Sequence, residues 1–326
     1  MNPNHYWKIE DGRIVALMGM SFGVNDIPVG SIGAIIPAHV KLPDPGYDVW
    51  IAADVKFDTP SCERSQIAIE SGTYIGPRCH VGIEVEIGEG CFIDREVTIR
   101  NRVRIGNGSS IGENSNIRGF ATISNAVDIG RDVSIGEFAV IGDGSSVGHD
   151  TKIDNGCVIG RMVHIGDDCR INVCANILDK CNLRNGVSLG NYVYVGDRTT
   201  IGNYTHIGND VKLDRELIVT AHSTLINGKI VQLHNIGGNG RNMIIYVDRY
   251  GDVVMSIGCQ NGISLKSFKS RIKRKMTSND SIEIYRNQME IIEAAFKSVG
   301  RANGVSTIYK VFQFAKKMFG IVELGR

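Results

Sequence analysis

The sequence predicts an all-β fold, a parallel β-helix shaped as a triangular prism and built from hexapeptide repeats, followed by a small α+β domain. Two observations predict it. Every sixth residue from Ile69 to Val231 is aliphatic, and the residue two positions before each of these anchors is mostly small or β-branched. Side chains alternate along a strand, so both positions point inward. Each hexad is therefore one short strand and one corner.

Three hexads make one triangular coil of about 18 residues, whose strands pair with those of the coils above and below. An isolated coil could not bury its anchors, so stability has to come from stacking, and each end needs a cap. The residue after the anchor is often Gly, as at Gly76 and Gly136, or Asp or Asn. We expect these residues to make the corners, because they turn a chain at little cost.

The repeat divides the chain into four expected segments. Pro60 and a charged residue at an anchor position interrupt the pattern before Ile69, and the pattern ends after Val231. We expect short strands at 14–17 and 33–36, a hairpin of 243–247 and 253–257, and amphipathic helices over 281–300 and from about 306. The segments are an N-terminal cap (1–48), an irregular first coil (49–68), the β-helix (69–234), and a C-terminal β-hairpin with helices (235–326).

Bulk composition excludes some classes of partner. The 326-residue chain has a formal net charge of +1, so no overall field would hold it on nucleic acid or an anionic membrane. Residues 1–12 lack the order of a signal peptide, and no run of about 18 apolar residues could span a membrane. We expect a cytoplasmic protein without a membrane partner, and we do not expect nucleic-acid binding.

The eight cysteines are best explained by the repeat. No pair is spaced as in a zinc or redox motif, so we predict no metal site. Five of them occupy the small inward position, where we expect them to fill the core: Cys79, Cys91, Cys157, Cys169 and Cys181. The roles of Cys62, Cys174 and Cys259 stay open.

An aliphatic anchor, then Gly, Asn or Asp, with a small residue two before the anchor, resembles the pattern of the hexapeptide-repeat superfamily. Periodicity does not set the hand of the coil, and it is this resemblance that implies a left-handed β-helix and a homotrimer. Two end segments, residues 13–16 with 48–51 and residues 236–237 with 258–268, are similar to hexapeptide-repeat proteins of phages, prophages and enteric bacteria. Those proteins are usually labelled acyl- or acetyltransferases.

Acyltransferases of this superfamily use a His as general base in a cleft between two prisms. Here His149 and His164 are the candidates, because Ser146 lies one coil beneath His164 and His149 follows Ser146 at the corner. Asp150 and Asp167 are the candidate orienting carboxylates. If the protein is a transferase, acetyl-CoA or another acyl-CoA is the expected cosubstrate. The γ-class carbonic anhydrases share the fold, but their His pair five residues apart is absent.

Two other surfaces stand out. An apolar strip on the otherwise polar prism favours a contact between subunits over a ligand surface or cover by the C-terminal domain. It comprises Phe138, Val140, Val158, Met162 and Tyr194. A basic run from Lys266 to Lys275 is interpreted as a solvated helix face, with phosphate contact as the alternative.

Two functions are compatible with this sequence. The first is a homotrimeric binding or scaffold protein, related to phages or prophages, that holds a ligand or partner in the clefts between subunits. The alternative is an acyltransferase that takes its acyl group from coenzyme A or an acyl carrier and uses a His base. The first is favoured because no insertion interrupts the repeat after Ile69 to cover a substrate.

Overall fold

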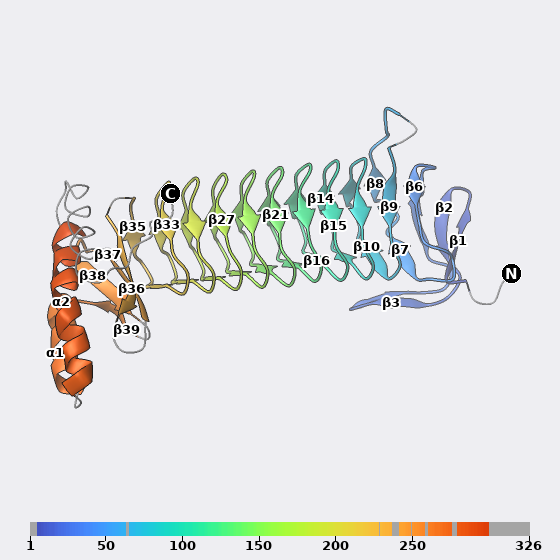
Figure 1. The fold of residues 1–326 in the computed structure, drawn as a ribbon. Coiled ribbons are helices and arrows are strands. Elements are labelled where there is room, and N and C mark those ends of the chain that lie inside the picture. The colour runs from blue at the N-terminus through green and yellow to red at the C-terminus, as the bar shows by residue number, and fades with distance from the viewer. Residues whose placement is uncertain are drawn as a thin grey trace. The chain divides into compact units, whose positions relative to one another are not determined.

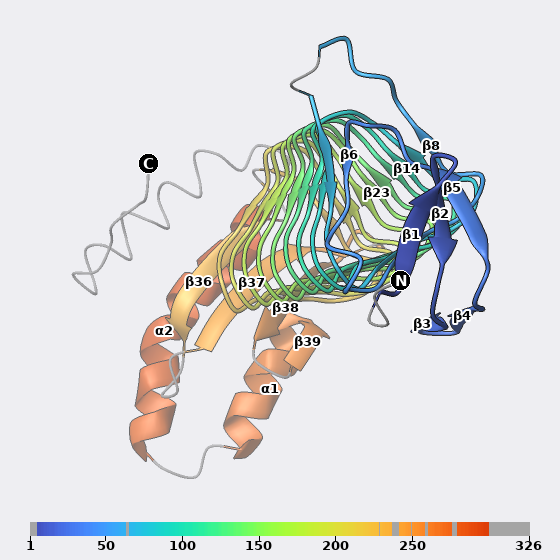
Figure 2. The same ribbon diagram turned by 90° about the vertical axis from the view of Figure 1, so that its right-hand side faces the viewer.

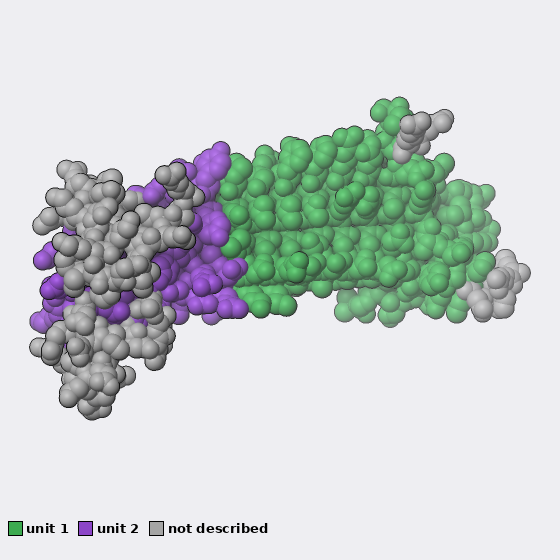
Figure 3. Space-filling model, viewed as in Figure 1, with its two compact units in different colours: residues 1–180 green, residues 181–326 purple. Residues whose placement is uncertain are grey.

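The computed structural model shows a left-handed parallel β-helix followed by an antiparallel sheet and two helices (Figure 1). It describes residues 5–62, 65–227, 229–236, 241–248, 250–257, 260–275 and 279–299. The chain forms two compact units, residues 1–180 and 181–326 (Figure 3). The predicted fold class is confirmed.

Unit 1 begins with short antiparallel strands. Strands β1 (Trp7–Glu10), β2 (Arg13–Ala16) and β5 (Ile32–Ile35) form one sheet, and β3 (Met20–Phe22) pairs with β4 (Asn25–Ile27) in a hairpin. The two strands expected here correspond to β2 and β5. The β3–β4 hairpin was not predicted from the sequence.

The coils of unit 1 have three flat faces, each a parallel sheet (Figure 2). Face 1 contains β6 (Val40–Lys41), β9 (Ile67–Ile69), β12 (Glu86–Ile87), β15 (Arg104–Ile105), β18 (Thr122–Ile123), β21 (Val140–Ile141), β24 (Val158–Ile159) and β27 (Asn176–Ile177). Face 2 contains β7 (Val49–Ile51), β10 (Thr73–Ile75), β13 (Phe92–Ile93), β16 (Ser110–Ile111), β19 (Asp128–Ile129), β22 (Ser146–Val147) and β25 (His164–Ile165). Face 3 contains β8 (Lys56–Phe57), β11 (His80–Val81), β14 (Thr98–Ile99), β17 (Asn116–Ile117), β20 (Ser134–Ile135), β23 (Lys152–Ile153) and β26 (Arg170–Ile171).

The anchors form the core of the prism. In the stacked strands each anchor pairs with the anchor of the next coil, as Ile123 does with Ile141, and both are at most 1% exposed. The first coil is longer than the others. Tyr74 pairs with Trp50 instead of with residue 56, which lies 18 residues before it, so the first coil is one hexad longer than the others.

The corners are not made by the glycines that follow the anchors, so that prediction was wrong. A positive φ recurs at every sixth residue from Gly72 to His222, always three positions after an anchor, and most of these residues are not glycine. A Cβ on Gly136, which follows an anchor, would lie 2.4 Å from the carbonyl carbon of Asp154 and 2.5 Å from the amide nitrogen of Asn155. Glycine is needed there because the next coil passes too close for a side chain.

Unit 2 continues with the same hexads and then changes architecture. Its parallel strands are β28 (Asn182–Leu183), β31 (Thr200–Ile201) and β34 (Ile218–Val219); β29 (Ser188–Leu189), β32 (His206–Ile207) and β35 (Thr224–Leu225); and β30 (Tyr194–Val195) and β33 (Lys212–Leu213). An antiparallel sheet follows, made of β36 (Val231–Ile236), β37 (Arg241–Val247), β38 (Val253–Ile257) and β39 (Gln260–Ile263). The helices are α1 (Leu265–Lys275) and α2 (Asn279–Val299).

The C-terminal sheet and α2 share one apolar core. Ile292 and Phe296 on α2 are buried in a cluster with Met243 on β37 and Met255 on β38. The apolar stripe of this amphipathic helix therefore packs on the sheet. The helix expected from about residue 306 lies outside the described residues.

Candidate functional site

Four polar side chains form a column along face 2. Ser110, Asp128, Ser146 and His164 each precede an anchor and pair in register from β16 to β25. Residues in this position point outward because the anchors point inward. Ser110 Oγ donates a hydrogen bond to Asp128 Oδ1 at 3.0 Å. The column therefore places a carboxylate, two hydroxyls and an imidazole at successive spacings of about 4.8 Å.

His164 is bonded to the hydroxyl beneath it. Its Nδ1 lies 2.7 Å from Ser146 Oγ, as the expected stacking of these two residues requires. If Nδ1 carries the proton and donates to Ser146, the lone pair of Nε2 faces outward, where it can accept a proton. The imidazole is exposed on its strand, so this nitrogen is accessible.

His149 belongs to a different structural series. The second residue after an anchor is often Asn or Asp, and its side-chain oxygen accepts the backbone N–H of the coil before, as Asn155 does from Glu137. At this position His149 Nδ1 accepts the N–H of Arg131 at 2.9 Å. A nitrogen that accepts carries no proton, so neutral His149 carries its proton on Nε2 and can donate there.

The structure places the two candidate orienting carboxylates at corners of the prism. Asp167 Oδ1 accepts the backbone N–H of His149 at 2.8 Å, so it orders the chain at His149. Asp150 occupies a corner with φ 54°. The hydrogen-bond partner that would orient His164 as a base is Ser146. It lies one coil, or 18 residues, before His164 in the sequence.

These groups border one shallow depression with a volume of about 400 Å³. Asp128, Arg131, Ser146, His149 and His164 all line it. The depression therefore brings both candidate histidines together with Asp128 and Arg131. Sequence reasoning missed Ser110, Asp128 and Arg131, although the first two lie whole coils before His164.

Aromatic side chains continue the same column toward the N-terminus. Tyr74 on β10 and Phe92 on β13 are stacked, with ring centroids 5.1 Å apart and planes 12° apart. Phe22 of the β3–β4 hairpin packs against Tyr74 at 5.7 Å, and burial raises the pKa of Tyr74. The hairpin thus lies on face 2 and buries the first part of its outer surface (Figure 1).

The expected subunit contact is exposed in unit 1. The exposed fractions are 57% for Phe138, 36% for Val140, 43% for Val158 and 63% for Met162. Phe138 also stacks on Phe120 at the preceding corner, with ring centroids 4.8 Å apart. Tyr194, in unit 2, instead has the Lys212 ammonium 5.4 Å from its ring centroid. An apolar strip of this kind on one prism face fits a protein contact surface.

The cysteines predicted to fill the core are all buried. Burial raises the pKa of the Cys79 thiol to about 12 and that of Cys157 to about 11, so these thiols stay protonated. Cys62 and Cys174 are exposed, whereas Cys259 lies outside the described residues. No group of three or more His, Cys, Asp or Glu in the described chain could hold a metal ion.

A histidine of unit 2 pairs with a carboxylate and an amide. His234 Nε2 donates to Asp214 Oδ2 at 2.8 Å, and its Nδ1 donates to Asn242 Oδ1 at 3.0 Å. The bond to Asp214 raises the pKa of His234, and the bond to His234 lowers the pKa of Asp214. Both bonds favour the protonated imidazole, which joins β36 to an earlier corner.

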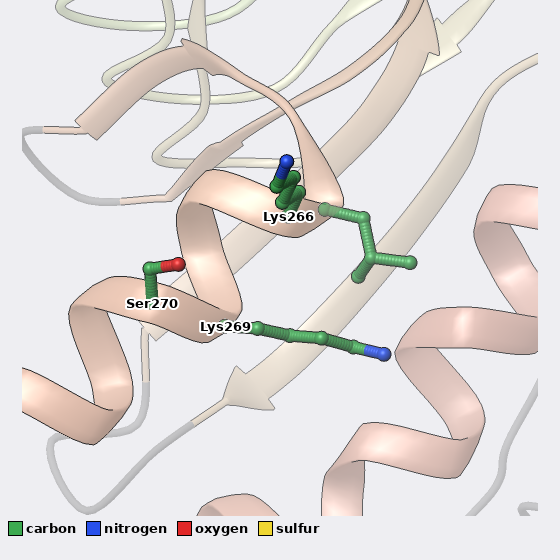
Figure 4. A pocket seen from close by; sticks show the side chains of 4 residues that line it. Lys266, Lys269 and Ser270 are labelled. Carbon is green, nitrogen blue, oxygen red and sulfur yellow. The ribbon is translucent and has the colours of Figure 1, made fainter.

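The basic run forms part of α1. Lys269 pairs with Glu293 on α2 at 2.5 Å, which fits a charge-balanced helix face. Lys266, Lys269 and Ser270 also line an open hollow of about 470 Å³ (Figure 4). None of the helices in the described chain is long and apolar enough to cross a membrane.

Comparisons with known proteins find one family model and a set of solved structures that are similar to this chain. The family model of the GMPPB C-terminal domain matches residues 62–180. The solved UDP-N-acetylglucosamine acyltransferase of Francisella novicida is 18% identical, covers 86% of this chain and 85% of its own, and has a TM-score of 0.38. For the Arabidopsis UDP-N-acetylglucosamine acyltransferase the values are 14%, 87%, 91% and 0.37. No curated protein sequence matches the chain.

Proposed function

We propose that this protein is an acyltransferase in which His164 removes the proton from the acceptor hydroxyl or amine. The observation that carries the proposal is the bond between His164 Nδ1 and Ser146 Oγ beside a depression that His149 and Arg131 also line. A base held by a neighbouring group, with its second nitrogen directed outward, is the arrangement that general base catalysis requires.

The reaction is acyl transfer from a thioester of coenzyme A or of an acyl carrier. His164 Nε2 takes the acceptor proton as the acceptor oxygen or nitrogen bonds to the thioester carbonyl carbon. The carbon–sulfur bond then breaks, and the imidazolium returns the proton to the leaving thiolate. The Nε2–H of His149 is a fixed donor, and such donors stabilise the oxyanion that forms in between.

The proposed assembly is a homotrimer that contacts its neighbours through the strip on face 1. Face 1 and face 2 meet at the corner of Met162, which lies two residues before His164. A neighbouring prism packed on face 1 would therefore border face 2 on the side of His164, whereas Arg131 and His149 line the depression toward the opposite corner. The neighbouring prism would then add a wall on the His164 side of the depression.

Release of thiol from a panel of acyl-CoA compounds, measured with and without candidate acceptors, tests the chemistry. We expect His164→Ala to lower the rate by about 10²- to 10⁴-fold, the usual contribution of a general base. His206→Ala is the matched control, because His206 precedes an anchor in unit 2 just as His164 does in unit 1. An equal loss in both variants would contradict the role of His164.

His149 can be tested without disturbing the coil. His149→Asn keeps a side-chain acceptor for the Arg131 N–H, because Asn155 accepts the Glu137 N–H in the same way. We expect an unchanged melting temperature and a rate about 10²-fold lower, as for loss of an oxyanion donor. An unchanged rate would assign His149 to structure alone.

A scaffold or binding role is the second candidate. The regular stacking of the strands of unit 1 from β9 onward supports it, since no inserted segment covers the depression in this part of the chain. The relatives named above do not include a phage protein, so the resemblance to phage proteins stays a prediction. Ligand-dependent thermal stabilisation without release of thiol would favour this role over the transferase.

A further inference from the structure

The aromatic column on face 2 stops where the polar column begins. Trp50, Tyr74 and Phe92 pair in register on β7, β10 and β13, and the next paired residue is Ser110. Because serine has no ring, nothing on β16 continues the stack of Tyr74 and Phe92. Phe92 is half-buried, and a flat ring placed above Ser110 would lie against it at the distance of one strand, about 4.8 Å.

Polar groups at this position suit a ring with N–H donors. Asp128 Oδ1 accepts the Ser110 hydroxyl, while Oδ2 has no hydrogen bond to the described residues. A carboxylate accepts but cannot donate, so it selects ring N–H or amino groups. Arg131 lines the same depression, and its guanidinium suits a phosphate.

The β3–β4 hairpin adds an apolar side to this position. Phe22 ends β3 and is 6% exposed, whereas Val24 at the turn is 95% exposed. The hairpin runs along the prism from its N-terminal end, so its turn is directed toward the coils that carry Ser110 (Figure 1). An apolar side chain at an exposed turn is suited to cover a ring.

We propose that Phe92, Asp128 and the turn of the β3–β4 hairpin form a nucleobase subsite that extends the depression of His164. The proposal deepens the proposed acyltransferase function and rests on it for the reacting end of the ligand. The nucleobase of the ligand stacks on Phe92 and donates a hydrogen bond to Asp128. The phosphate of the ligand contacts Arg131, and its reacting group reaches His149 and His164. The nucleotide belongs either to the coenzyme A donor or to a nucleotide-linked acceptor.

Binding to the full-length protein tests the subsite directly by calorimetry. The probes are AMP, GMP, UMP, CMP, adenosine 3′,5′-bisphosphate, coenzyme A and pantetheine. We expect Phe92→Leu to weaken nucleotide binding by about 5- to 150-fold, the range for loss of one base–aromatic stack. Phe92→Trp should retain binding. Phe120→Leu is the matched control, because Phe120 also stacks on a ring but lies at a corner away from face 2.

Preference for adenosine 3′,5′-bisphosphate and coenzyme A would assign the subsite to the donor, and preference for another nucleotide would assign it to the acceptor. Asp128→Asn should weaken the binding of bases that donate N–H. The subsite is overturned if no probe binds, or if all bind Phe92→Leu as tightly as the parent protein.

Failure of the subsite and failure of the proposed function are distinguishable. Acyl-pantetheine has no nucleobase, so the release of thiol from it reports the chemistry alone. This release should be lost in His164→Ala and retained in Phe92→Leu. Nucleotide binding that depends on Phe92 but persists in His164→Ala supports the subsite even when no transfer is found. Transfer that depends on His164, with nucleotide binding independent of Phe92, overturns the subsite and leaves the function standing.

Discussion

Replacing a glycine that follows an anchor tests why those glycines are present. In Gly136→Ala the added Cβ would lie 2.4 Å and 2.5 Å from backbone atoms of Asp154 and Asn155 in the next coil. Real carbon contacts are much longer, so the coils must separate locally. Overpacking of this kind costs about 1 to 3 kcal/mol. Because backbone atoms cannot rotate away, we expect the upper half of that range.

Gly208 provides the matched control, because it also follows an anchor. A Cβ there would meet its first neighbour, the Leu225 carbonyl oxygen, at 3.4 Å, which is ordinary contact. Gly208→Ala should therefore be neutral, or stabilising by about 0.4 to 1 kcal/mol through the lower entropy of the unfolded chain. Neither glycine has a positive φ, so backbone strain does not enter the comparison.

Urea unfolding followed by circular dichroism and by fluorescence of the buried Trp7 and Trp50 measures both variants. Both spectroscopic signals are needed because stacked repeats can unfold in more than one step. The stacking explanation requires Gly136→Ala to lower the unfolding midpoint and Gly208→Ala to leave it or raise it. An equal loss in both would refute it and return the corner role to these glycines.

Three other perturbations have defined outcomes. Ile153→Ala, at a fully buried anchor, should cost about 2 to 5 kcal/mol in urea unfolding, with a loss below 1 kcal/mol contradicting the assigned core. Because folding raises the pKa of His234, this group contributes stability that is complete below about pH 6.5 and is lost as pH rises through its folded pKa. Because folding lowers the pKa of Asp214, that group contributes stability that is lost as pH falls below about 4. Both side chains are partly exposed, so the pair stabilises the fold by at most about 1 kcal/mol. The parent protein should unfold at a higher urea concentration at pH 6 than at pH 8.5, and His234→Gln should remove the part of this difference that the pair causes. Phe138→Asn removes the exposed ring but introduces a residue type that tolerates positive φ. The proposed trimer should therefore dissociate in sedimentation experiments, while circular dichroism shows no loss of secondary structure. An unchanged mass would place the contact elsewhere.

The fold could be predicted because burial imposes its pattern on the sequence at every coil. The aliphatic positions stepped from Ile69 to Leu225 are the buried anchors, and Cys157 and Cys169 fill inward positions two residues before an anchor. The last position of the predicted series, Val231, belongs instead to the antiparallel strand β36. The β3–β4 hairpin could not be predicted in this way. It packs through a few contacts such as Phe22 on Tyr74, and a single contact of this kind leaves no period in the sequence. The extra hexad before β9 was visible only as a break at Pro60.

The candidate site was predicted in part. The spacing of one coil placed Ser146 under His164, and the structure shows that bond. The spacing could not decide whether Asp150 or Asp167 orients a histidine, because both side chains lie at corners. Only atomic geometry distinguishes a carboxylate that binds a backbone N–H from one that faces an imidazole. The αL conformation of Phe138 and Met162 was also hidden, since bulky residues are uncommon there.

The structure limits where function can be encoded in such a chain. In each hexad the anchor and the residue two before it fill the core. The residue after the anchor is often a glycine that allows close stacking, as Gly136 does. The next residue often accepts a backbone N–H of the preceding coil, as His149 does from Arg131. The two remaining positions are the outward residue before the anchor and the exposed corner. His164 and Asp128 occupy the first of these, and Phe138 and Met162 occupy the second. Substitutions at the outward positions can therefore change binding and chemistry at little cost to stability, and this freedom makes His164 the better candidate base of the two histidines.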